Sequence, residues 1–115
     1  MPAFAPAPAI NIAVYAELQD AAGAEFAADL VATFIEEAPP MLAELRAALV
    51  GGDAERFRRA AHSLKSNGHT FGAAPLAELA RDLELGGLPA DATPLDALDT
   101  EYARAAAALQ ALARG

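Results

Sequence analysis

The sequence predicts an all-α fold, an up-and-down antiparallel four-helix bundle with one or two short additional helices at its N-terminus. Three observations lead to this prediction. The chain is rich in alanine and leucine and poor in β-branched residues, a composition that favours helices. Glycine and proline fall in clusters, and between the clusters apolar residues recur at helical spacing. No segment shows the period of two that a half-buried strand requires.

The first half of the chain predicts three helices. A short one covers about residues 12–20, and a second follows Gly23. The apolar side of the second helix consists of Phe26, Leu30, Phe34 and Ile35. Pro39 and Pro40 suit the first turn of a third helix, where a missing N–H costs little, and this helix ends at Gly51.

The second half predicts three more helices. The first follows Asp53, a suitable N-cap, and runs to about Phe71, where Gly72 can end it in a left-handed conformation. The next covers residues 75–86, and the last begins near Thr93. The apolar stripe of the first contains Phe57, Ala61, Leu64, Gly68 and Phe71, and that of the last contains Leu95, Leu98, Tyr102, Ala105, Leu109 and Leu112. Stripes this regular favour near-antiparallel packing of long helices.

The length of 115 residues fits one domain. We expect residues 1–9 to be a flexible Ala/Pro-rich lead-in and residues 10–115 to form the domain. The start has neither a basic region nor an unbroken apolar segment, so it does not resemble a signal peptide, and no apolar run is long enough to span a bilayer. The absence of cysteine excludes disulfides and thiolate metal sites and fits the cytoplasmic location that we predict.

The charge of the chain argues against several classes of partner. The net charge is −8, which disfavours general binding to nucleic acid or to an anionic membrane. Four of the eight basic residues nevertheless cluster within ten positions, and these are Arg56, Arg58, Arg59 and Lys65. No carboxylate lies between Arg56 and Ala77 in the sequence, so we expect one positive surface there.

His62 lies in this basic cluster and outside the apolar stripe. It is about 100° around the helix from Ala61. The residues one turn away are all polar, namely Arg58, Arg59, Lys65 and Ser66. The imidazole should therefore face water with cations beside it, a setting that suits an anion. A phosphoryl group is an anion that a neutral imidazole can accept.

This helix allows other interpretations. An ordinary solvated face would show the same pattern of arginines and one histidine. His62 and His69 are about 10 Å apart along a helix, which is far for one metal ion, and no cysteine or nearby carboxylate completes a set of ligands, so no metal site is predicted. A nucleophilic triad lacks a carboxylate near His62 in sequence, although a distant one stays open.

The segment Ala61-His62-Ser63-Leu64-Lys65-Ser66, followed by Gly72-Ala73, resembles the signature of histidine-containing phosphotransfer (HPt) domains of bacterial phosphorelays. That signature has alanine, histidine, a small residue, leucine and lysine, with glycine-alanine ten and eleven places beyond the histidine. The resemblance spans about residues 12–112 and includes Leu83-Glu84 at the end of the following helix. One departure is Ser66, since many members have glycine after the lysine.

The resemblance implies a phosphoryl carrier rather than an enzyme. His62 would be phosphorylated on Nε2, with Lys65 beside the phosphoryl oxygens. The implied partners are response-regulator receiver domains, including those of a hybrid histidine kinase. The receiver would hold Mg²⁺, so that the carrier needs no cofactor. Helices for obligate dimerisation are not evident, which favours a monomer.

Further residues receive roles by position. We expect Arg58, Arg59, Ser66 and His69 to form the partner surface around His62. Gly68 lies on the apolar stripe, where close helix packing explains it better than a functional bend, and Gly72 is structural as well. The alternative function is a non-catalytic helical adaptor that binds a receiver or a kinase, but such a protein would be free to lose His62 or Lys65, and both are present.

Overall fold

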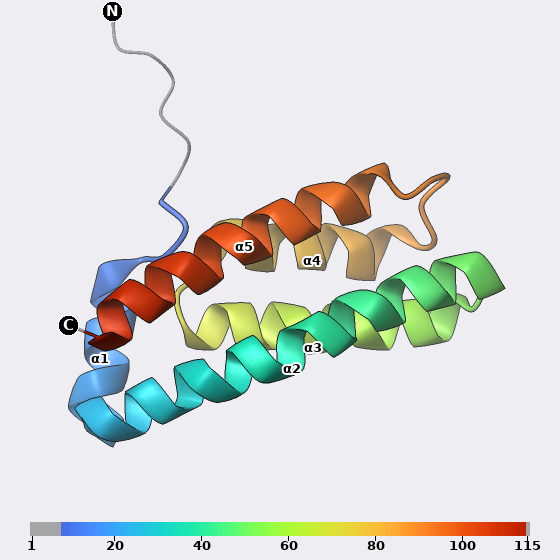
Figure 1. Cartoon of the computed structure of the whole chain (residues 1–115). Coiled ribbons are helices and arrows are strands. Elements are labelled where there is room, and N and C mark those ends of the chain that lie inside the picture. The colour runs from blue at the N-terminus through green and yellow to red at the C-terminus, as the bar shows by residue number, and fades with distance from the viewer. Residues whose placement is uncertain (1–7, 115) are drawn as a thin grey trace, which may run out of the picture.

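The structure, a computed structural model, describes residues 8–114 (Figure 1). Within this range the chain forms five α-helices and no strand, which confirms the all-α class. The helices are α1 (Ile12–Ala22), α2 (Ala24–Gly51), α3 (Ala54–Thr70), α4 (Ala74–Gly86) and α5 (Thr93–Arg114). The predicted lead-in, residues 1–9, lies outside the described residues except for its last two positions, as does the last residue of the predicted domain.

The prediction of separate helices before and after Pro39 is wrong, because α2 runs through both prolines as one helix. Pro39 and Pro40 lack the N–H groups that would bond to the carbonyls of Ile35 and Glu36. The Tyr102 hydroxyl of α5 donates a hydrogen bond of 3.2 Å to the Ile35 carbonyl and so replaces the first of these bonds. Glu36 is exposed, so water can reach its carbonyl. A contact between α2 and α5 thus lets the helix continue where the prolines predict that it ends.

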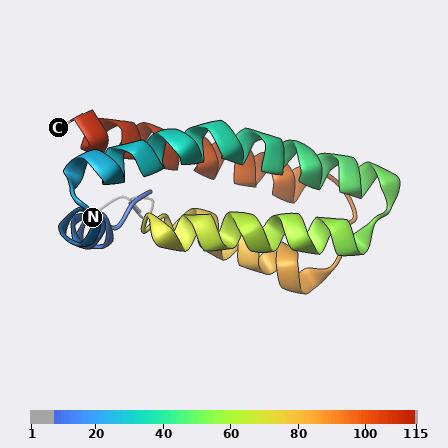
Figure 2. The same ribbon diagram turned by 90° about the horizontal axis from the view of Figure 1, so that it is seen from below.

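The four long helices lie side by side, each against two others. Figure 2 shows α2 with α5 in one layer and α3 with α4 in the other. The packed pairs are α2 with α3, α3 with α4, α4 with α5, and α2 with α5. Helix α1 packs against α2 at one end of the molecule (Figure 1). The Asn11 N–H also donates to the Gly72 carbonyl at 2.8 Å, which ties the start of α1 to the turn between α3 and α4.

The apolar stripes predicted from the sequence face the core, with few exceptions. The α3 stripe is buried along its whole length, and so are Leu95, Leu98, Ala105 and Leu109 of α5. Rings from α2, from α5 and from the C-cap of α3 meet here, because Phe34 of α2 lies 5.1 Å from Phe71 and 5.7 Å from Tyr102 between ring centroids. Phe26, which the sequence places on the buried side of α2, is instead 55% exposed.

The two ends of α3 are formed as the sequence predicts. The Asp53 carboxylate accepts a hydrogen bond of 3.0 Å from the Arg56 N–H, which caps the first turn. Gly72 has φ +73°, and a Cβ atom at this position would lie 2.8 Å from Cβ of Val14. Both the backbone conformation and the contact with α1 therefore favour glycine. These ends fix the length of the helix that carries His62.

The continuity of α2 leads to a prediction about Tyr102. Tyr102→Phe should lower the free energy of unfolding by about 1 kcal/mol, since it removes the hydroxyl that satisfies the Ile35 carbonyl. In a Pro39→Ala background the same substitution should cost less, because the introduced alanine would supply an N–H to that carbonyl. Urea denaturation of the four proteins of this double-mutant cycle measures the difference. An equal cost of Tyr102→Phe in both backgrounds would contradict the assigned role of the hydroxyl.

Candidate functional site

His62 projects from the surface of α3, as the sequence predicts. Its side chain is 56% exposed, while its neighbour Ala61 and the next stripe residue Leu64 are fully buried. The core residues on either side fix the rotation of α3, and that rotation presents the imidazole at the edge facing α4. The ring is therefore held by a rigid helix and is open to an approaching partner.

A carboxylate from α4 meets the imidazole. Oε2 of Glu84 lies 2.7 Å from Nδ1 of His62. The Glu84 side chain is only 11% exposed, so it lies beneath the ring. No carboxylate is close to His62 along the chain, and the sequence pointed to Glu84 only as part of the family resemblance. The structure adds it to the site, because α3 and α4 are antiparallel neighbours that bring positions 22 residues apart together.

The hydrogen bond to Glu84 decides which nitrogen of His62 is free. Hydrogen bonds from Lys65 and from His62 hold the pKa of the Glu84 carboxyl below its ordinary value, so the group is an anion that only accepts hydrogen bonds. Nδ1 must therefore carry the proton. In the neutral ring Nε2 then has an unshared electron pair, and it is turned away from Glu84. This is the form of imidazole that can act as a nucleophile through Nε2.

Lys65 completes a three-residue cluster. Its ammonium lies 2.6 Å from Oε1 of Glu84, so that one carboxylate bridges the lysine and the histidine. The Lys65 side chain is 23% exposed, so it is partly accessible beside the ring. A cation in this place can bind the oxygens of a phosphoryl group that arrives at Nε2.

Glu84 can lie directly below the ring because α4, which carries it, packs closely against α3. Gly68 is buried, and a Cβ atom at this position would lie 3.1 Å from Cβ of Ala77 and 3.3 Å from its Cα. The absence of a side chain thus lets the two helices approach closely one turn beyond Lys65. This contact fits the packing explanation that the sequence favoured for Gly68.

The sequence predicted one positive surface from the stretch without carboxylates between Arg56 and Ala77. This prediction is wrong for three of its four cations, which are paired with carboxylates. Arg56 makes two hydrogen bonds to Glu44 of α2, at 2.5 and 2.6 Å, and Lys65 pairs with Glu84. Arg58 pairs with Glu55 of its own helix at 2.5 Å. The pairing carboxylates come from the neighbouring helices α2 and α4 and from the first turn of α3. Of the four cations, only Arg59 has no ion pair within residues 8–114.

The other residues of the predicted partner surface lie around the cluster without joining it. Ser66 and His69 are exposed on α3, and neither side chain makes a hydrogen bond in the described part of the chain. Between residues 8 and 114 no group of three histidine, aspartate or glutamate side chains is placed to hold a metal. No helix in the same range is long and apolar enough to cross a bilayer.

Comparison with known proteins places this geometry in a family. Residues 29–108 match the Hpt domain family. The chain is an Hpt domain. The crystal structure of histidine-containing phosphotransfer protein B from Pseudomonas aeruginosa is similar, with a TM-score of 0.83 and 27% sequence identity over 95% of this chain and 97% of that one. No curated protein matches the sequence.

Membership of the family gives the general role of the protein. Hpt domains serve in histidine phosphotransfer within two-component phosphorelays, and they are phosphocarriers rather than true enzymes. They work with receiver domains. The all-helical structure of this Hpt domain agrees with that role.

The geometry of Glu84 leads to a prediction about the ring of His62. In the wild-type protein at neutral pH, the uncharged imidazole should carry its proton on Nδ1. Glu84→Gln should reduce this preference, because an amide accepts a hydrogen bond more weakly than a carboxylate. Long-range ¹H–¹⁵N correlation spectra report the tautomer directly. Glu78→Gln, an exposed change on the same helix, is the matched control, and an unchanged tautomer in Glu84→Gln would contradict the assignment.

Proposed function

We propose that His62 is the phosphoryl acceptor of this Hpt domain and that Nε2 is the atom that binds phosphorus. The observation that carries the proposal is the bond from Nδ1 to a carboxylate beneath an exposed ring. The donor is the aspartyl phosphate of one receiver domain, and a second receiver takes the group on. The transfer is reversible, so either receiver can be the donor.

The proposed step needs no proton transfer at the attacking atom. The electron pair of Nε2 forms the N–P bond while the P–O bond to the receiver aspartate breaks, and the aspartate leaves with the electron pair as a carboxylate. The imidazole becomes positively charged because it keeps the proton on Nδ1. Glu84 lies 2.7 Å from that nitrogen and stabilises the new charge.

Lys65 has a complementary role in this proposal. Charge on the transferred phosphoryl group is spread over three equatorial oxygens. The ammonium of Lys65 is close enough to exchange its contact with Oε1 of Glu84 for one of these oxygens. The receiver supplies Mg²⁺ and most of the stabilisation, so the Hpt domain itself uses no cofactor. A non-catalytic adaptor would have no use for this cluster of three residues.

We also propose a more detailed architecture and setting. The four long helices form an up-and-down antiparallel four-helix bundle, with α1 as the single short additional helix, which the pairwise packing of the helices supports. We expect the domain to act as a monomer in the cytoplasm, with receivers, including those of hybrid histidine kinases, as its partners. The cysteine-free sequence fits this setting.

The first test is phosphorylation by candidate receivers. Receiver domains carrying labelled aspartyl phosphate are incubated with the full chain, and the chain is then examined for label. A label that is labile in acid and stable in base is expected, because phosphohistidine has these properties and phosphoserine does not. Binding of receivers without any transfer would instead favour the adaptor function.

His62→Gln should abolish the labelling while the helix content and the thermal midpoint stay nearly constant. The stability should change by no more than about 0.5 kcal/mol, since the side chain is exposed. Circular dichroism and label transfer are measured on the same preparation. Retained labelling would remove His62 from its role, and a large loss of stability would show that its contact with Glu84 is mainly structural.

Lys65→Ala should slow phosphoryl transfer by about 10- to 100-fold without preventing receiver binding, because it removes one cation from the transition state and no docking contact. Single-turnover quench-flow measurements give the rate, and calorimetric titration of the unphosphorylated receiver gives the affinity. An unchanged rate would mean that Lys65 only balances the charge of Glu84.

A further inference from the structure

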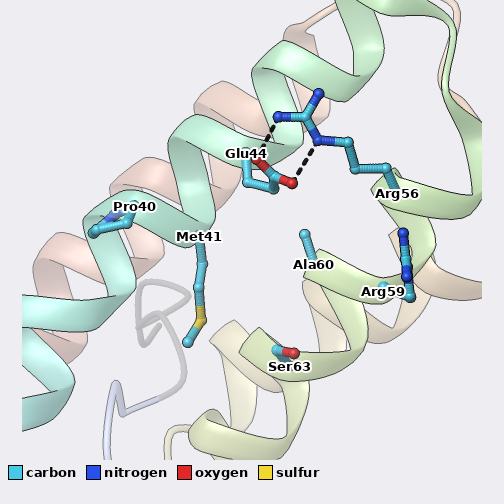
Figure 3. A pocket seen from close by; sticks show the side chains of 7 residues that line it. All are labelled: Pro40, Met41, Glu44, Arg56, Arg59, Ala60 and Ser63. Atoms are coloured by element: carbon cyan, nitrogen blue, oxygen red, sulfur yellow. Dashed lines mark hydrogen bonds and ion pairs between the residues drawn. The ribbon is translucent and has the colours of Figure 1, made fainter.

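A groove between α2 and α3 opens on the opposite flank of α3 from Glu84. Figure 3 shows its two walls, with Pro40 and Met41 on α2 and Arg59, Ala60 and Ser63 on α3. Ser63 follows His62 directly in the chain, so the groove begins next to the phosphoryl acceptor. The ion pair of Arg56 with Glu44 spans the space between the walls at one end (Figure 3).

The groove combines an apolar lining with one available cation. Its apolar lining residues are Pro40, Met41 and Ala60. Arg59 is exposed and makes no ion pair among the described residues. The two carboxylates close enough to influence it, Glu44 and Glu55, already accept hydrogen bonds from Arg56 and Arg58.

This arrangement separates two arginines that are equivalent in the sequence pattern. Arg58 is engaged in a salt bridge with Glu55 at 2.5 Å, in which Nε and Nη2 both donate to that carboxylate, so part of its charge and of its donors is already in use. Arg59 can form a hydrogen bond with an incoming carboxylate without losing an existing ion pair. A guanidinium suits this purpose because its planar donors match the geometry of a carboxylate.

We propose that the groove binds a segment of the receiver that carries an acidic side chain among apolar ones, and that Arg59 determines specificity by pairing with that acid. This inference rests on the proposed function of His62. A second copy of the chain is a poor occupant, because two molecules of net charge −8 repel each other. A small free anion would find only one available cation and no buried donors.

The test compares single arginine substitutions in the full chain. The receiver is one that accepts phosphoryl groups from the wild-type protein. Arg59→Ala should weaken its binding by about tenfold, the effect of one charge-assisted hydrogen bond, and should reduce the dependence of the affinity on salt. Arg81→Ala is the matched control, since Arg81 is also exposed and makes no ion pair within residues 8–114, but it lies on α4 and outside the groove. It should change the affinity less than about twofold.

Met41 provides an independent measurement of the same contact. The sequence contains two methionines, Met1 and Met41, so a ¹³C-methyl label on methionine gives a simple spectrum. Addition of the unphosphorylated receiver should shift the Met41 signal, because its side chain lines the groove. This readout does not depend on any substitution or on transfer chemistry.

Each outcome supports or overturns the inference. A selective loss of affinity in Arg59→Ala together with a shift of the Met41 signal supports it. Equal losses in Arg59→Ala and Arg81→Ala would show long-range attraction only and would overturn it, as would an unperturbed Met41 methyl. If the wild-type chain accepts no phosphoryl group from any receiver, the proposed function itself fails. That result can be told apart from failure of the inference alone, in which the wild type accepts phosphoryl groups but Arg59→Ala binds the receiver with unchanged affinity.

Discussion

The Glu84 carboxylate holds the candidate site together through its two oxygens. One contacts Nδ1 of His62 and the other contacts the Lys65 ammonium, so the positions of both functional groups depend on a residue from a different helix. Its height is set by the close approach of α3 to α4, which Gly68 permits by having no side chain against Ala77. The chemistry of the surface thus follows from packing one layer below it.

Local sequence patterns predicted the parts of the site that lie on one helix. The apolar stripe of α3 gave the rotation of the helix, so the exposure of His62 and the neighbouring place of Lys65 could be derived. Glu84 could not be found in this way, because its contact depends on the alignment of two helices. One signal was available: His62 and Glu84 are nearly equidistant from the turn at Gly72, as residues that face each other in a helical hairpin must be.

Two predictions from the sequence were wrong for the same reason: the helix boundary at Pro39 and the continuous positive surface around His62. Pro39 predicts a helix boundary from local chemistry, but a hydroxyl 67 residues away from Ile35 satisfies the carbonyl that the proline leaves free. The positive surface around His62 was inferred from a stretch without carboxylates. Glu44 and Glu84 of the neighbouring helices nevertheless pair with Arg56 and Lys65. Sequence patterns describe the surroundings of a residue along one helix, whereas hydrogen bonds and ion pairs between helices require the tertiary structure.

The fixed proton on Nδ1 also affects how long a phosphoryl group would stay transferable. In the proposed phosphorylated state, Glu84 keeps this proton on the ring, at a contact of 2.7 Å in the unmodified protein. When the P–N bond breaks, such a ring departs as neutral imidazole, whereas a ring without the proton would depart as a much more basic anion. In that proposed state, the carboxylate beneath His62 would keep the ring a good leaving group, so that a stored phosphoryl group would stay ready for the next receiver.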